Sequence, residues 1–265
     1  MNIYDYGARN YDPQLGRFFN IDRFSEKYMS STPYHYTLNN PIKYVDINGD
    51  SVNVSESYNE ETKTRNVNIY FEYAVKNSSK DKINMNVLLT AINSQLLNTY
   101  LKNEKDGESG VTTVVNLELK GRVLGKGDKR KKSEHLIEVK DAKEPAFSGF
   151  YGSTSGFGGT EITLGSGAVK GIVAGADLVT VPHEVGHAFG LIHPDERSSL
   201  LLDSDQYIWP WNRGKNKYKN NVMWSEESGR LNNQTSTEVT LEQIGYILKN
   251  FNKGRLNQRP FGSGN

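Results

Sequence analysis

Residues 183–193 read His-Glu-Val-Gly-His-Ala-Phe-Gly-Leu-Ile-His, an HExxHxxGxxH string that contains three of the five histidines in the chain. His183 and His187 are four residues apart, so on a helix both rings lie on one face and can reach the same ion. Gly190 tolerates the left-handed backbone that ends a helix. The chain can then bend back, which brings His193 toward the same point from outside the helix.

The start of this helix is also marked in the sequence. Thr180 suits the N-cap, and Pro182 is tolerated only in the first turn. The pattern therefore predicts a short helix over about residues 181–189. Val185 and Phe189 would suit an ordinary buried helix, but such a helix has no need of three histidines and a glutamate in this register.

The residue types at this spacing point to zinc chemistry. Imidazole nitrogen binds Zn²⁺ at about 2.0–2.1 Å, and a catalytic zinc site keeps three protein ligands and an open position for water. Glu184 follows the first ligand, where it can act as general base toward a water whose pKa the metal lowers. The string predicts a Zn²⁺ cofactor on His183, His187 and His193, with Glu184 as the catalytic residue. The chain has no cysteine, which excludes a thiolate zinc site and a disulfide framework.

The overall composition narrows the classes of partner. A length of 265 residues suffices for one large domain or two small ones. The formal net charge is +1, so no global field attracts nucleic acid or a membrane surface. No run of 18 apolar residues is present, and no membrane span is expected. Met1 is followed by Asn-Ile-Tyr-Asp, so no signal peptide is expected either.

Residues 51–251 are predicted to form one α+β domain, followed by a polar tail over residues 252–265. Alternating and β-branched apolar residues predict strands, and apolar residues at helical spacing predict helices. Asp81 is a possible cap of the first expected helix, and Thr240 with Glu242 and Gln243 resembles a capping start of the second. The expected strands are 67–75, 111–124, 136–139 and 160–164, and the expected helices besides the motif helix are 81–102 and 240–250.

The element order, together with the zinc string, resembles the metzincin zinc endopeptidases. The stretch Asn-Asn-Val-Met-Trp-Ser at 220–225, whose Met223 lies 30 residues beyond His193, resembles the Met-turn of that family. The resemblance implies a twisted mixed sheet with an active-site helix and flanking helices, and a cleft beneath an edge strand, expected at 158–164. It also implies that Met223 supports the metal site from beneath, where a flexible apolar side chain fills space. An ordinary core methionine and an ordinary internal strand are the alternatives.

Residues 1–50 differ in character from the rest and are crowded with aromatic residues and turn signals. The stretches YDYGARNYDP at 4–13, LGRF at 15–18 and LNNP at 38–41 resemble the end of an RHS repeat-associated core domain. In that family this segment closes a large β-rich shell, and a variable toxin domain follows. At the junction the chain reads Asp-Ile-Asn-Gly-Asp over 46–50, which departs from the Asp-Pro-x-Gly string where some members cut themselves.

Together the two resemblances imply a zinc-dependent endopeptidase that is the toxin module of an RHS-type polymorphic toxin. The expected partners are a protein or peptide substrate and a cognate immunity protein. The expected location is outside the producing cell, as part of a larger bacterial RHS protein that is secreted or delivered into a target cell. Two alternatives stay open: a protease that matures its own parent protein, and an inactive shell or adhesion fragment.

Three further features have both a functional and an ordinary interpretation. The basic run KGDKRKK at 126–132 suits nucleic acid or phospholipid, or a solvated hairpin tip. Asp195 and Glu196 follow the third histidine, where one of them suits a hydrogen bond that orients a metal ligand, or both suit an ordinary surface loop. Aromatic residues in the loop 203–219 suit a substrate pocket, or simple packing of the loop. His135 lies on an expected strand and is not expected to bind metal.

Overall fold

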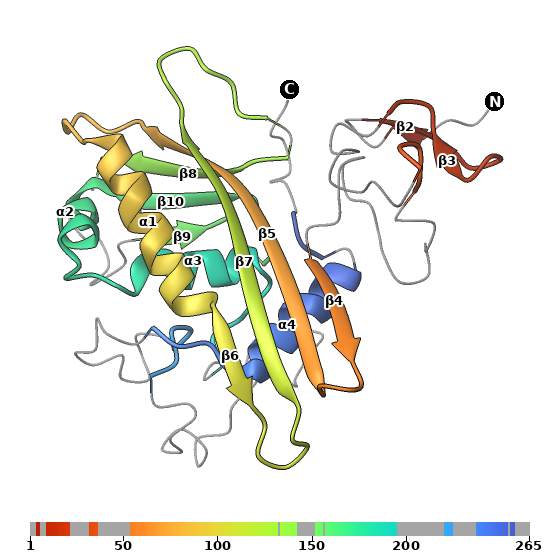
Figure 1. The fold of residues 1–265 in the computed structure, drawn as a ribbon. Helices are drawn as coiled ribbons and strands as arrows, with labels where there is room; N and C mark the ends of the chain where they lie inside the picture. The colour runs from red at the N-terminus through yellow and green to blue at the C-terminus, as the bar shows by residue number, and fades with distance from the viewer. Residues whose placement is uncertain are drawn as a thin grey trace.

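The computed structural model describes residues 4–5, 9–21, 32–36, 54–131, 133–141, 152–155, 157–194, 220–224, 237–253 and 255–257. Within these ranges the fold is mixed α+β, with one curled seven-stranded sheet, four helices and a separate three-stranded sheet (Figure 1). The predicted α+β class is therefore confirmed. In this part of the chain no helix is both long and apolar enough to cross a membrane.

The large sheet is built on one long central strand, β5, which pairs in parallel with both β7 and β8. β8 pairs in parallel with β10, and β10 pairs antiparallel with β9, so the order is β6-β7-β5-β8-β10-β9, with β4 also paired to β5. All four predicted strands are present. The strands are β4 (Val54–Asn59), β5 (Thr64–Asn77), β6 (Lys102–Lys105), β7 (Thr112–Val123), β8 (His135–Lys140), β9 (Gly152–Thr154) and β10 (Glu161–Gly165).

Four helices accompany this sheet: α1 (Met85–Tyr100), α2 (Ser166–Ala174), α3 (Thr180–Ala188) and α4 (Leu241–Asn252). α1 packs on β5 and β7, α3 packs on β9 and β10, and these two helices contact each other. The expected start of α1 at Asp81 is wrong, because the side chain of Asn84 accepts the hydrogen bond of Val87 N and begins the helix there. The start of α4 is confirmed, with Thr240 and Gln243 forming a full capping box.

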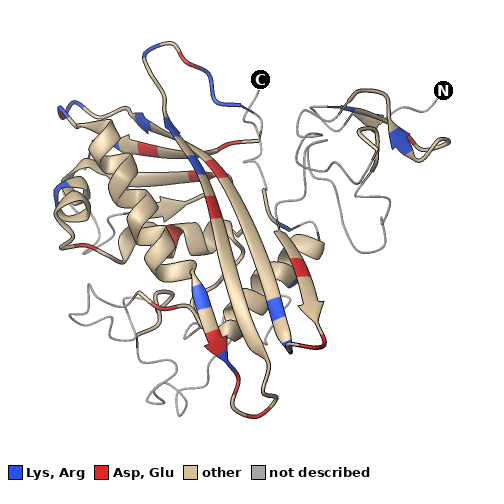
Figure 2. Ribbon diagram, viewed as in Figure 1, with Lys and Arg blue, Asp and Glu red and all other residues tan. Residues whose placement is uncertain are grey.

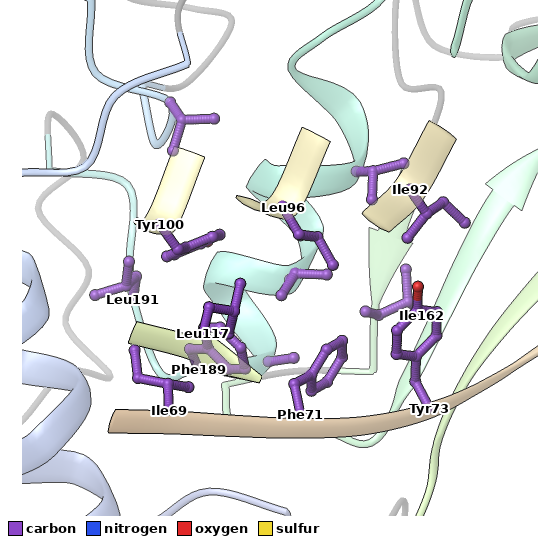
Figure 3. Packing of buried hydrophobic residues seen from close by; sticks show 14 of the residues in the cluster. Ile69, Phe71, Tyr73, Ile92, Leu96, Tyr100, Leu117, Ile162, Phe189 and Leu191 are labelled. Atoms are coloured by element: carbon purple, nitrogen blue, oxygen red, sulfur yellow. The ribbon is translucent and has the colours of Figure 1, made fainter. Parts of the chain in front are cut away.

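A cluster of aromatic rings fixes the position of α3 (Figure 3). Alternate residues of β5 point to one face of the sheet, and from that face the ring of Phe71 lies 5.1 Å from Phe189. Tyr100 of α1 meets Phe189 edge-on at 5.3 Å, and its hydroxyl donates to the carbonyl of Pro182 over 2.7 Å. Burial raises the pKa of Tyr100 far above its ordinary value, so this hydroxyl stays a donor. The short helix α3 is thus held from its start to its end.

The basic run at 126–132 lies in the connection between β7 and β8, which both pair with β5 and form no hairpin. Residues 126–129 and 131 are exposed, as expected of a solvated tip, while Arg130 is half-buried against the sheet. Arg130 donates to the carbonyl of Thr160 over 3.1 Å, and its guanidinium pairs with a carboxylate of β10. Lys131 forms ion pairs with Glu72 and Glu134, two carboxylates whose side chains are almost fully buried. Basic and acidic residues accordingly alternate along this part of the sheet and its connecting loop (Figure 2). Nothing in this pattern favours nucleic acid.

The N-terminal segment forms the short strands and turns that its composition predicts. The three strands are antiparallel, β1 (Tyr4–Asp5), β2 (Asn10–Asp12) and β3 (Arg17–Phe18). Phe18 is buried, and the guanidinium of Arg9 lies 3.8 Å from its ring centroid. The expected junction at 46–50 and most of the expected tail at 252–265 lie outside the described residues. The domain limits therefore stay predictions.

His135 gives the fold a testable dependence on pH. Its ring is buried against Phe71 at 4.9 Å, and burial, followed by the charge of Arg130, lowers its pKa to about 4. The unfolded chain takes up this proton near pH 6.5, so stability is lost as the pH falls from about 6.5 toward 4. At pH 5 we expect protonation of His135 in the unfolded chain to lower the free energy of unfolding by about 2 kcal/mol relative to pH 7.

The measurement is chemical denaturation at pH 7 and pH 5, for the wild type and His135→Leu. The variant should lose about 2 kcal/mol less than the wild type between the two pH values. Equal losses in both proteins would contradict the assignment, because all other titrating groups are shared.

Candidate metal centre

The structure brings the three histidines of the zinc string together at one point. The Nε2 atoms of His183 and His193 lie 3.0 Å apart, and that of His187 lies 3.1 Å from each of them. His183 is buried, and the other two rings are half-buried. Among the histidine and acidic side chains of the described residues, these three histidines form the group whose ligand atoms lie close enough together to hold a metal ion. His135 lies apart from it in the core.

The geometry of this cluster fits a tetrahedral zinc ion. With bonds of about 2.0–2.1 Å, tetrahedral coordination places ligand atoms roughly 3.3 Å apart, close to the observed separations. The Nδ1 atoms face carbonyl oxygens, at 2.8 Å from Val222 O for His183 and at 2.8 Å from Leu191 O for His187. A carbonyl only accepts, so in the neutral rings Nδ1 carries the proton and Nε2 presents a lone pair. Two Nε2 lone pairs directed at one point over 3.1 Å repel each other, and a cation between them removes this repulsion.

The start of α3 is stabilised by a residue that the sequence analysis missed. Asp177 Oδ1 accepts from Val179 N at 3.1 Å and from Thr180 N at 3.0 Å, and its Oδ2 accepts from the Thr180 hydroxyl at 2.7 Å. The expected N-cap at Thr180 is therefore wrong, because that residue is already in the helix and Asp177 satisfies the first amide groups. An Asp three residues before a Thr-x-Pro sequence is the signal that could have found it.

The end of α3 turns as the motif predicts. Gly190 adopts a φ of +77°, and a Cβ at this position would lie 2.8 Å from Asn250 Nδ2. Asn250 of α4 donates to the carbonyl of Gly190 over 2.8 Å, and Leu191 N donates back to the carbonyl of Gly186 over 2.8 Å. The turn that carries the chain to His193 therefore has a fixed partner in the C-terminal helix, which local sequence could not reveal.

Met223 packs against α3 at Gly186, and its expected support of a metal site stays a prediction. Its side chain is buried, and its sulfur occupies the space that a Cβ at Gly186 would need. The hydroxyl of Tyr100 would lie 3.1 Å from the same Cβ. Gly186 is thus required for the close approach of the Met223 sulfur to α3.

The side chain of Glu184, on α3, contacts β9, the last strand of the sheet order. The hydroxyl of Thr154 is 2.8 Å from Glu184 Oε2 and 2.8 Å from the carbonyl oxygen of the same residue. Gly152 lies so close that a Cβ there would be 2.8 Å from Glu184 Cγ. The expected edge strand at 158–164 is wrong, because β10 is flanked on both sides, by β8 and β9. In the described sheet, β9 is the terminal strand next to the site.

Several predicted features near the site lie outside the described residues. They are Asp195 and Glu196, and the aromatic loop at 203–219. Their proposed roles stay predictions.

Three comparisons with known proteins were made. No family model matches the chain. Over 47 residues, 18% of this chain, the sequence is 47% identical to a salivary gland surface protein of Aedes aegypti, and the match spans 1% of that protein. A solved structure of an archaemetzincin from Methanopyrus kandleri matches with 15% identity and a TM-score of 0.30, covering 52% of this chain and 87% of that one. That score is too low to establish a common fold, and none of the comparisons supports the RHS segment.

The contact between Gly186 and Met223 can be tested by substitution. Gly186→Ala places a methyl group against the sulfur, and we expect a loss of about 1–3 kcal/mol in the free energy of unfolding together with weaker zinc binding. In the double variant with Met223→Ala the collision is removed, so its loss should be smaller than the sum of the single losses.

Gly245→Ala is the matched control, because a Cβ at Gly245 of α4 meets open space. We expect it to be neutral or stabilising by up to about 1 kcal/mol. Denaturation curves and zinc titration of the wild type, the two single variants, the double variant and Gly245→Ala provide the measurement. A Gly186→Ala protein as stable as Gly245→Ala would contradict the packing described here.

Proposed function

We propose that this chain is a zinc-dependent peptidase. The observation that carries the proposal is the convergence of three imidazole Nε2 atoms within 3.0–3.1 Å. Two of them come from helix α3, which also carries the Glu184 carboxylate, and the third comes from His193 after that helix. Histidine nitrogens are ligands that suit zinc, and three of them leave one coordination position open. A structural zinc site would close that position with a fourth side chain.

His183, His187 and His193 would hold the ion, which supplies Lewis acidity that acidifies a water molecule and polarises the scissile carbonyl. Glu184 takes the proton of the attacking water and later transfers it to the leaving amine nitrogen. The single hydroxyl proton of Thr154 has two acceptors at 2.8 Å, Glu184 Oε2 and the Glu184 carbonyl oxygen, so this contact ties the carboxylate to β9 before substrate arrives.

We place the substrate chain along β9, which lies beside α3. One side of β9 pairs with β10, while the other side is the terminal edge of the described sheet. An extended peptide can add to such an edge through backbone hydrogen bonds. This mode gives weak sequence preference, so any specificity must come from side-chain pockets along the edge.

We further propose that the peptidase is a toxin module delivered by a larger protein. It rests on the resemblance of residues 1–50 to an RHS core segment, quoted above. The test is expression of the full chain in a bacterial host. The wild type should arrest growth while a catalytically inactive variant does not, and equal growth would reject the toxin role without touching peptidase activity.

The peptidase proposal itself is tested with Glu184→Gln. This change keeps the shape of the side chain but removes the base, so we expect zinc content to stay at the wild-type level. Cleavage of an unstructured protein substrate should fall by about 10²–10⁴-fold in kcat/KM. Removal of zinc from the wild type with a chelator should abolish cleavage, and added Zn²⁺ should restore it. Full cleavage by Glu184→Gln would overturn the assignment.

Thr154 provides a finer test of the same site. Thr154→Val keeps the shape but removes the hydroxyl, and we expect kcat to fall by about 10-fold, the effect of one hydrogen bond to a charged group. KM should change little, because the bond is made to the enzyme and not to substrate. Thr154→Ser restores the donor and should retain most of the rate. An equal loss of kcat in Thr154→Val and Thr154→Ser would mean that Thr154 contributes through packing and not through its hydroxyl.

A further inference from the structure

The Met-turn is joined to the start of α4 by a pair of side-chain amides. Asn221 Nδ2 donates to Gln243 Oε1 over 2.9 Å, and Gln243 Nε2 donates to Asn221 Oδ1 over 3.2 Å. Asn221 is 1% exposed and Gln243 is 6% exposed, so both amides are away from water. Breaking either bond would leave a buried polar atom without a partner, which makes the pair a strict constraint on both segments.

This amide pair continues toward the metal ligands. Asn221 Oδ1 also accepts from Met223 N at 2.9 Å, and Val222 N, between them, donates to the carbonyl of Glu238 over 2.8 Å. The carbonyl of Val222 then accepts from His183 Nδ1 at 2.8 Å. The two backbone N–H groups on either side of the Val222 carbonyl are therefore both bonded: that of Val222 to Glu238, and that of Met223 to Asn221, which Gln243 of α4 holds.

Gln243 does more here than a helix cap requires. Its Oε1 accepts from Thr240 N at 2.9 Å, while its backbone N donates to the Thr240 hydroxyl, which completes the capping box. A glutamate would serve this box equally well. Only an amide can also donate to Asn221 Oδ1, so the choice of glutamine is explained by the contact with the Met-turn and not by the cap.

We propose that Asn221 and Gln243 are positioning residues of the metal centre. Their amide pair holds the Val222 carbonyl at the distance that fixes the tautomer and ring orientation of His183. Partners of this kind behind a ligating histidine commonly change metal affinity by 10–100-fold when they are lost. The inference rests on the metal site of the proposed function, but not on peptidase activity or on any substrate.

The test uses the full chain and substitutes Gln243 in two ways. Gln243→Glu keeps the capping acceptor but sets an oxygen against Asn221 Oδ1, and Gln243→Met keeps the length but removes every polar contact of the side chain. We expect zinc affinity, measured by competition with a chromophoric chelator, to fall by about 10-fold or more in both variants. The visible absorption spectrum of the Co²⁺-loaded protein should change as well, because the geometry at His183 is altered.

Thr240→Ala is the matched control. It removes the hydroxyl from the capping box, while Thr240 N and the amide pair are kept. We expect a lower Tm but wild-type zinc affinity and a wild-type Co²⁺ spectrum. Circular dichroism shows whether each variant is folded at the temperature of the titration.

Two results with the variants would overturn the inference. One is wild-type zinc affinity and Co²⁺ spectrum in folded Gln243→Glu or Gln243→Met. The other is a loss of affinity in Thr240→Ala as large as in Gln243→Glu, since general weakening of α4 would then be the cause. A wild-type chain that binds no zinc would overturn both the proposed function and this inference. Zinc binding without peptidase activity would overturn only the proposed function.

Discussion

The rest of the site depends on two hydrogen bonds from imidazole Nδ1 atoms to backbone carbonyls. They join His183 to Val222 and His187 to Leu191, each over 2.8 Å. Because a carbonyl only accepts, both rings are set to present Nε2 as a lone pair toward one point. The zinc string places the rings on one helix face, but these carbonyls give them a usable tautomer and orientation.

The zinc string was informative because its chemistry is local. Residues four apart on one helical turn share a face whatever surrounds them, and a glycine at positive φ ends the helix at Gly190 by its own backbone freedom. The long strands were predictable for the same reason, since alternation along β5 and β7 needs no knowledge of the partner strand. The capping box at Thr240 is likewise complete within four residues.

The features that sequence analysis missed or misplaced depend on distant partners or contradict local propensity. β9 is three residues long and exists as a strand because β10 pairs with it. α2 contains two glycines in nine residues, which disfavours a helix until burial of Ile172 and its neighbours offsets the loss. The edge strand was assigned to β10 because nothing in its sequence reveals that β9 covers it. Asn250 and Asn221 read as ordinary polar residues until their backbone and side-chain partners are known.

α3 has nine residues, fewer than the roughly 12–15 that an isolated helix needs to persist in water. Its stability therefore comes from its neighbours: Asp177 before it, the ring cluster around Phe189, Met223 beneath it, and Asn250 after it. His183, Glu184 and His187 lie on these nine residues, and His193 follows five residues after the helix. If the proposed function holds, the contacts that stabilise α3 therefore also position the metal ligands and the base. A zinc ion that binds the folded arrangement alone would in turn stabilise the fold.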